Sequence, residues 1–127
     1  LHATPFGLIF LLRIFQKAKE QRETNDIAAT LFEELIELFM YIAESINDAF
    51  KCEHAEELPN FADMLKEEYL WTEEYDEEKD ELRYEENPFP DDLFYSFYYY
   101  SYIVLLECKP LIEDEISENA KKLHSWL

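Results

Sequence analysis

Glycine is almost absent from the sequence, since Gly7 is the only one among 127 residues. Hairpin turns use glycine at positive φ, and phosphate-binding loops use it where the backbone approaches a ligand closely. A single glycine therefore disfavours a β-rich fold. It also excludes the sequences GxxxxGK[ST], GxGxxG and GxSxG, together with the enzymes that depend on these loops. We expect an all-α protein.

Cysteine and histidine are also scarce. Cys52 and Cys108 form no CxxC pair, which favours two buried thiols in a reducing compartment and hence a cytoplasmic location. The histidines, His2, His54 and His124, belong to no HExxH sequence and to no ExxH pair of a di-iron bundle. We therefore expect no metal site, no cofactor and no catalytic residues.

Long apolar runs are missing as well. The longest extends from Leu8 to Leu12 and resumes after Arg13, which is short of the roughly 20 residues that cross a membrane. It has no basic stretch before it and no small-residue cleavage site, so a signal peptide is not expected either. The run is predicted to begin the first helix of the fold.

Positive charge is the last deficit, with 11 Lys and Arg against 30 Asp and Glu and a formal charge of −19. This balance repels phosphate, which excludes general binding to DNA, RNA or an anionic membrane. A large partner should therefore be basic.

The five prolines divide the chain into stretches of helical length, and the length suits one domain. We predict a single helical domain over 1–127, a bundle of about five helices with an acidic helix and loop at 60–92. The expected helices span about 5–23, about 25–57 after a cap at Thr24 or Asn25, a third segment after Asn60, a fourth from Asp91 or Asp92 to Cys108, and a last one from Leu111. In the last helix one face is expected to hold Ile112, Ile116, Ala120, Leu123 and Leu127.

The second helix is predicted to be the centre of the bundle, because its apolar stripe covers about half of its circumference. The stripe consists of Ile27, Leu31, Leu35, Leu38, Ile42, Ile46 and Ala49, widened by Phe32, Ile36, Phe39, Ala43 and Phe50. The fourth segment contains Tyr98, Tyr99 and Tyr100 and lacks the period-two alternation of a strand, so we predict a buried helix there.

Negative charge is concentrated in one region, since residues 53–92 carry 17 acids and 3 bases. On a helix, acids three or four apart are neighbours at about 5–6 Å, close to the spacing of phosphates along a nucleic-acid strand. Such a ridge can imitate those phosphates, although keeping it helical costs like-charge repulsion. The alternative is an acidic face that only keeps the protein in solution.

Aromatic side chains accompany this ridge, as at interface hot spots, and Trp71 or Tyr75 could anchor a partner. The predicted partner-binding residues are Asp63, Glu67, Leu70, Glu73, Glu74, Glu77, Glu78, Asp80, Glu81, Tyr84, Glu85 and Phe89. They indicate an inhibitor or neutraliser that covers a basic, nucleic-acid-binding protein such as a nuclease or toxin. Immunity proteins, antitoxins and DNA mimics belong to this class.

Two other functions are compatible with the sequence. One is a structural or adaptor subunit whose first and fourth helices form an oligomer interface. The other depends on Glu33-Glu34-Leu-Ile-Glu37, which resembles the EExxE element of MazG-type all-α nucleotide pyrophosphohydrolases. This resemblance implies a Mg²⁺-dependent hydrolase, with Glu34 and Glu37 side by side on the helix. The second element of that family, ExxD, occurs only as Glu77-x-x-Asp80 within the acidic run, and cations for a triphosphate are sparse.

Overall fold

The computed structural model describes residues 6–54 and 91–127, with side chains over 6–50 and 91–127. These residues form four helices and no strand: α1 (Phe6–Gln21), α2 (Asp26–His54), α5 (Leu93–Ile112) and α6 (Glu118–Ser125). The predicted all-α class is confirmed across this part of the chain. The predicted number of helices and the single domain over 1–127 depend on residues outside it, as does the helix expected after Asn60.

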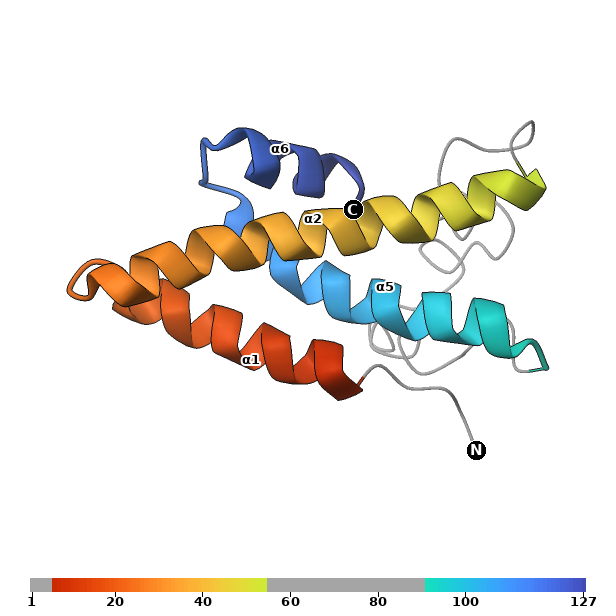
Figure 1. The fold of residues 1–127 in the computed structure, drawn as a ribbon, viewed down its shortest axis with the longest axis horizontal. Coiled ribbons are helices and arrows are strands. Elements are labelled where there is room, and N and C mark those ends of the chain that lie inside the picture. Colours follow the sequence, from red (N-terminus) through yellow and green to blue (C-terminus); the bar gives the residue numbers. More distant parts are fainter. Residues whose placement is uncertain (1–5, 55–90) are drawn as a thin grey trace, which may run out of the picture.

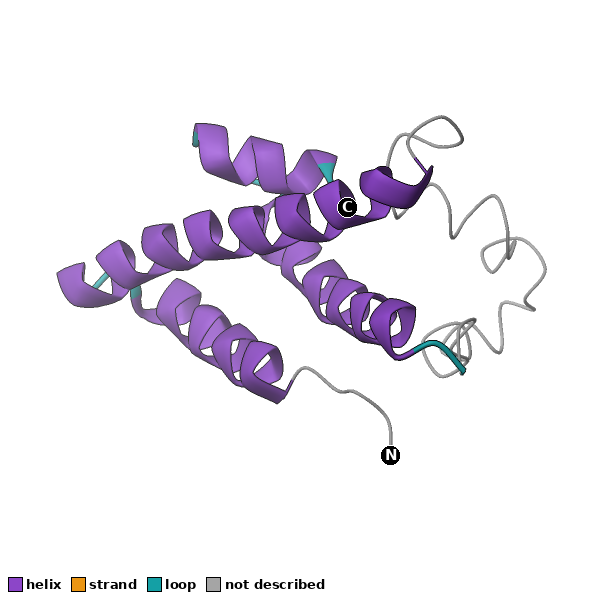
Figure 2. Cartoon of the chain, turned by 45° about the vertical axis from the view of Figure 1, so that its right-hand side comes forward, coloured by secondary structure: helices purple, strands orange, loops and turns teal. Residues whose placement is uncertain are grey.

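The long helix α2 organises the packing. It contacts α1, α5 and α6, with α6 on one side and α1 and α5 on the other (Figures 1 and 2). The four helices share one hydrophobic core that includes Phe15 of α1, Phe39 of α2, Tyr99 of α5 and Leu123 of α6, all fully buried. The prediction that α2 is the central helix is therefore confirmed.

Two helices begin at caps that the sequence predicts. The Asn25 side-chain oxygen accepts hydrogen bonds from the backbone N–H groups of Ile27 and Ala28, at 2.9 and 3.2 Å. At the start of α5, Asp92 Oδ1 accepts from Phe94 N and Tyr95 N, at 2.9 and 3.1 Å. Each cap satisfies amide groups that have no partner within the helix itself.

The tyrosine-rich segment is helical, as predicted. In α5, Tyr99 is fully buried whereas Tyr98 and Tyr100 are only partly buried, so the run of three tyrosines contributes to the core and also reaches its edge. Later in the same helix, Cys108 is a free, buried thiol.

The predicted boundary at Pro110 is wrong, because α5 continues through the proline to Ile112. Proline removes one backbone hydrogen bond, but only two residues of the helix follow it, and the second, Ile112, is buried in the core. The last helix begins later than predicted, at Glu118, where Ser117 Oγ accepts from Ala120 N at 3.2 Å. Ile116 precedes this helix and is 86% exposed, so its predicted place on the buried face is also wrong.

The buried face of α2 is rotated from the predicted centre of its stripe. Ile27, Leu31 and Leu38 were expected in the core, yet they are 80%, 36% and 39% exposed. The centre of the buried face instead follows the largest side chains, with Phe32 and Phe39 fully enclosed. Enclosing aromatic rings removes the most apolar area from water, so these positions determine which way α2 faces. The rotation leaves an apolar row on the solvent side of α2.

Cations at the end of α1 hold the helices together. Arg22 pairs with Glu115 at 2.8 Å and Lys19 with Asp114 at 3.1 Å, joining α1 to the connection between α5 and α6. The Arg22 guanidinium also lies 4.7 Å from the Phe32 ring centroid, and Phe32 stacks on Phe15 at 4.7 Å. These two cations therefore have structural roles and do not offset the acidic surface of α2.

Candidate protein-binding site

The predicted partner-binding residues lie outside the described part of the chain. This holds for every acidic and apolar member of the set, namely Asp63, Glu67, Leu70, Glu73, Glu74, Glu77, Glu78, Asp80, Glu81, Tyr84, Glu85 and Phe89. The predicted ridge of 53–92 therefore stays a prediction. What the structure does place is a second acidic surface, on α2, which was not among the partner-binding residues predicted from the sequence.

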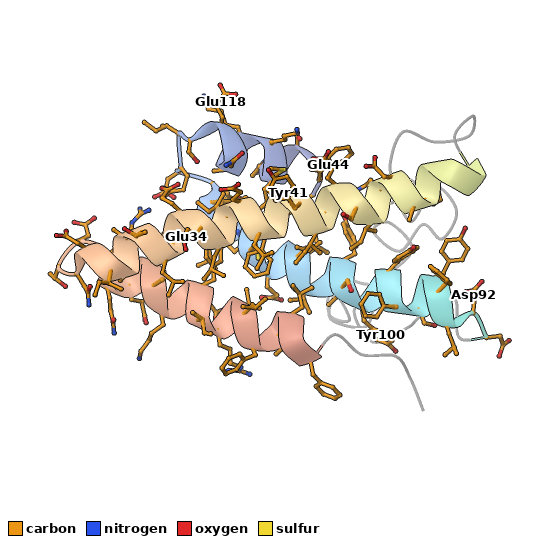
Figure 3. All side chains as sticks on the ribbon, viewed as in Figure 1. Glu34, Tyr41, Glu44, Asp92, Tyr100 and Glu118 are labelled. Carbon is orange, nitrogen blue, oxygen red and sulfur yellow. The ribbon has the colours of Figure 1, made fainter. Side chains whose placement is uncertain are left out.

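Helix α2 carries acids and no exposed base over most of its length. Between Arg22 and Lys51 there is no Lys or Arg. Five acids in this interval follow one another at steps of four or seven residues and so lie along one side of the helix. We call them the α2 acid row: Asp26, Glu33, Glu37, Glu44 and Asp48. Four of them are exposed, and Glu44 is half-buried (Figure 3).

Few cations balance the α2 acid row. Among the described residues, its one ion pair joins Glu44 to Lys122 of α6 at 3.6 Å. Lys19 and Arg22 are held by Asp114 and Glu115 at the far end of α1. Apart from Glu44, the row therefore presents carboxylates that have no ion pair with any residue that the structure describes.

An open apolar groove of about 710 Å³ lies between α1, α2 and α5. Each helix contributes one wall: Phe6, Gly7, Leu8 and Leu11 from α1, Tyr41, Ile42, Ser45 and Ile46 from α2, and Phe97, Tyr98 and Ser101 from α5. We call this the three-helix groove. Tyr41 is labelled on α2 in Figure 3. None of the described lining residues is charged, so the groove suits apolar side chains rather than an ionic ligand.

Large apolar side chains at the groove remain in contact with solvent. Phe6 is 75% exposed, Tyr41 54% and Phe97 44%. Such side chains are ordinary when scattered singly, but here they converge on one hollow from three helices. This combination of aromatic anchors and an open apolar hollow is typical of a protein-binding surface.

The groove was missed in the sequence reasoning because it is a tertiary feature. Phe6, Tyr41 and Phe97 are separated by more than thirty residues each, and no local pattern links them. The one signal was Gly7, a glycine in the first turn of α1, directly before the apolar run from Leu8 to Leu12.

The glutamates of the EExxE sequence are all exposed on α2. Across residues 6–54 and 91–127, no three His, Cys, Asp or Glu side chains are placed to hold a metal ion. Within the same residues, no helix has the length and apolar character required to cross a membrane.

The chain was compared with protein-family models, with curated proteins and with solved structures, and none of these comparisons gave a match.

Proposed function

We propose that this protein binds the basic surface of another protein through its acidic helical faces, and thereby blocks the nucleic-acid-binding groups of that partner. The observation that carries the proposal is the α2 acid row, a line of carboxylates with no Lys or Arg between residues 22 and 51.

Retaining the α2 acid row costs stability. Carboxylates such as Glu33 and Glu37, four residues apart on a helix, repel one another by about 0.2–0.5 kcal/mol. A single Lys in this interval would relieve the repulsion, and none is present. A role of these carboxylates in binding a partner explains why the sequence retains this repulsion.

The segment predicted from the sequence as a partner site carries net negative charge, like the α2 acid row. Residues 55–90 carry 14 acids and 3 bases, so the chain offers a basic partner two strongly acidic regions rather than one. Complementary charge accelerates association and suppresses binding to acidic proteins. Carboxylates on the partner's Lys and Arg would then occupy the positions that nucleic-acid phosphates otherwise take.

The experiment uses the full chain as an immobilised bait for proteins from its native source, eluted with a salt gradient. We expect the retained protein to be basic and to elute as salt rises. With the purified partner, affinity should fall steeply between about 50 mM and about 500 mM salt, because screening shortens the range of these interactions.

A matched pair of variants tests the α2 acid row itself. Glu37 on α2 and Glu107 on α5 are both exposed, so Glu37→Lys and Glu107→Lys change the net charge equally. Glu37→Lys should weaken binding about threefold to tenfold, as expected for one interfacial charge reversal, and Glu107→Lys should not. A partner of neutral or acidic composition, a salt-independent affinity, or equal effects of the two variants would overturn the proposal.

A further inference from the structure

We propose that the three-helix groove receives an amphipathic helix of the partner, with its apolar face in the groove and Lys or Arg along its flanks. This inference rests on the proposed function, since it assigns the part of the basic partner that contacts the described helices.

Small residues keep the groove open. Each wall has one, Gly7 on α1, Ser45 on α2 and Ser101 on α5, while the remaining lining side chains are large and apolar. Large apolar residues supply contact area, and small ones leave room for the side chains of a ligand. The arrangement favours a ligand that inserts several apolar groups.

Gly7 is the most informative of the three. It lies within α1, its φ is outside the positive range, and a Cβ added there would meet nothing within 4 Å. The backbone therefore does not require glycine, and the fold has space for a side chain. Glycine is also a poor helix former compared with alanine. Gly7 lines the groove without occupying it with a side chain.

A helix fits the groove better than an extended peptide does. The three walls are α-helices whose backbone groups are bonded internally, so no strand edge is available for an added β-strand. An extended peptide in an apolar groove would leave its N–H and C=O groups without partners, which is costly. A helix satisfies these groups itself and offers apolar side chains at three- and four-residue steps.

The charges around the groove determine which helix can bind. On α2, Glu37 is four residues before Tyr41, and Asp48 is three residues after Ser45, so both lie within one helical turn of the groove wall. Asp91 and Asp92 stand just before α5, about one and a half turns before its first wall residue, Phe97. On α1 the nearest charge is Arg13, two residues beyond the last wall residue, Leu11. The charges within one turn of the α2 wall are therefore acidic.

This charge disfavours a second copy of the chain, and also its acidic segment 55–90, as the occupant. A second copy seated on the groove would bring its own acidic residues close to Glu37 and Asp48 of the first copy. The segment 55–90 carries 14 acids against 3 bases and would meet like charge as well. A partner helix with Lys or Arg beside its apolar face gains attraction where both alternatives incur repulsion.

The test measures binding of a labelled peptide to the full chain by fluorescence anisotropy. The probe is a helical peptide of about 14 residues with Leu at i, i+3, i+4 and i+7 and Lys at its polar positions. One control peptide has the same composition in shuffled order, and another has Glu in place of Lys. We expect the patterned Lys peptide to bind at least about tenfold more tightly than either control, because only it presents both features.

Gly7→Trp fills the groove from a position where the fold has room, and Gln16→Trp adds the same side chain at an exposed site elsewhere on α1. Gly7→Trp should lower the affinity for the patterned peptide about tenfold to a hundredfold, as expected when one apolar side chain of the peptide can no longer bind in the groove. Gln16→Trp should leave the affinity unchanged. Circular dichroism and thermal unfolding confirm that both variants are folded.

The outcomes separate this inference from the proposed function. If Gly7→Trp does not reduce binding, or if the shuffled peptide binds equally well, the groove is not the site. The proposed function still stands in that case if Glu37→Lys weakens binding of the partner and salt does too. A failure of the patterned peptide to bind also overturns the inference. So does a dimer in sedimentation that Gly7→Trp dissociates, because the groove would then bind a second copy of the chain.

Discussion

Glu37→Lys is expected to make the protein more stable while it weakens partner binding. Glu37 is exposed, and Glu33 and Glu34 lie four and three residues before it on the same helix. The substitution removes two like-charge pairs and creates two attractive pairs, each at about 5–6 Å and about 0.2–0.5 kcal/mol. Glu and Lys have nearly equal helix propensities, so this contribution stays small. The free energy of unfolding should rise by about 1 kcal/mol, or about 3–4 °C in melting temperature for a chain of this length.

The assay is urea and thermal unfolding followed by circular dichroism at low salt and at about 1 M salt. The Debye length falls from about 10 Å at 0.1 M to about 3 Å at 1 M, which is below the spacing of these side chains. Most of the gain in stability should therefore disappear at high salt. Glu37→Gln, which removes the repulsion without adding attraction, should give about half of the effect. A destabilised variant, or a gain that persists at 1 M salt, would refute the electrostatic description of the α2 acid row.

Three further predictions concern the fold. Phe32→Ala removes a fully buried ring that stacks on Phe15 and lies beneath Arg22, so the free energy of unfolding in urea should fall by about 3–5 kcal/mol. A loss below about 1 kcal/mol would contradict this packing. Burial and the neighbouring Glu107 carboxylate raise the pKa of the Cys108 thiol to about 12, so in a Cys52→Ser background the native protein should react with iodoacetamide at pH 8 far more slowly than the urea-unfolded protein. Equal rates would show that the thiol is accessible. The Lys19 ammonium lowers the pKa of Asp114 by a hydrogen bond, so the folded state releases this proton at lower pH than the unfolded state does. The resulting stability is present above the unfolded pKa of about 3.9 and is lost as pH falls through the folded pKa. The difference in stability between wild type and Asp114→Asn should therefore shrink as acid is added, and a difference that grows would refute the assignment.

Local features of the fold could be predicted because they depend on neighbouring residues. The scarcity of glycine indicated helices. The sequence also predicted caps at Thr24 or Asn25 and at Asp91 or Asp92, and in the structure Asn25 and Asp92 are the caps. The helix over the tyrosine-rich segment could also be predicted from its cap and its lack of alternation. In each case the residues that decide the structure lie within a few positions of one another.

Features that depend on other helices could not be predicted in the same way. The apolar stripe of α2 covers half of the helix, so the sequence alone could not decide whether Ile27 or Phe32 faces the core. The packing of α1 and α5 on one side of α2 and of α6 on the other determines which α2 residues face the core. Continuation of α5 through Pro110 similarly depends on burial of Ile112 among other helices. The three-helix groove arises from the same arrangement, and its residues come from three separate segments.

Zero-length carbodiimide crosslinking of the partner complex is the most direct test of the claim that acidic helical faces contact a basic protein. The reagent joins carboxylates to lysine amines that are already in contact, and mass spectrometry identifies both residues. We predict crosslinks from Glu37 and Asp48 on α2, and from acids between Asp63 and Glu85, to lysines on the nucleic-acid-binding surface of the partner. Crosslinks that arise only from acids elsewhere, such as Glu107 or Glu118, would contradict the account.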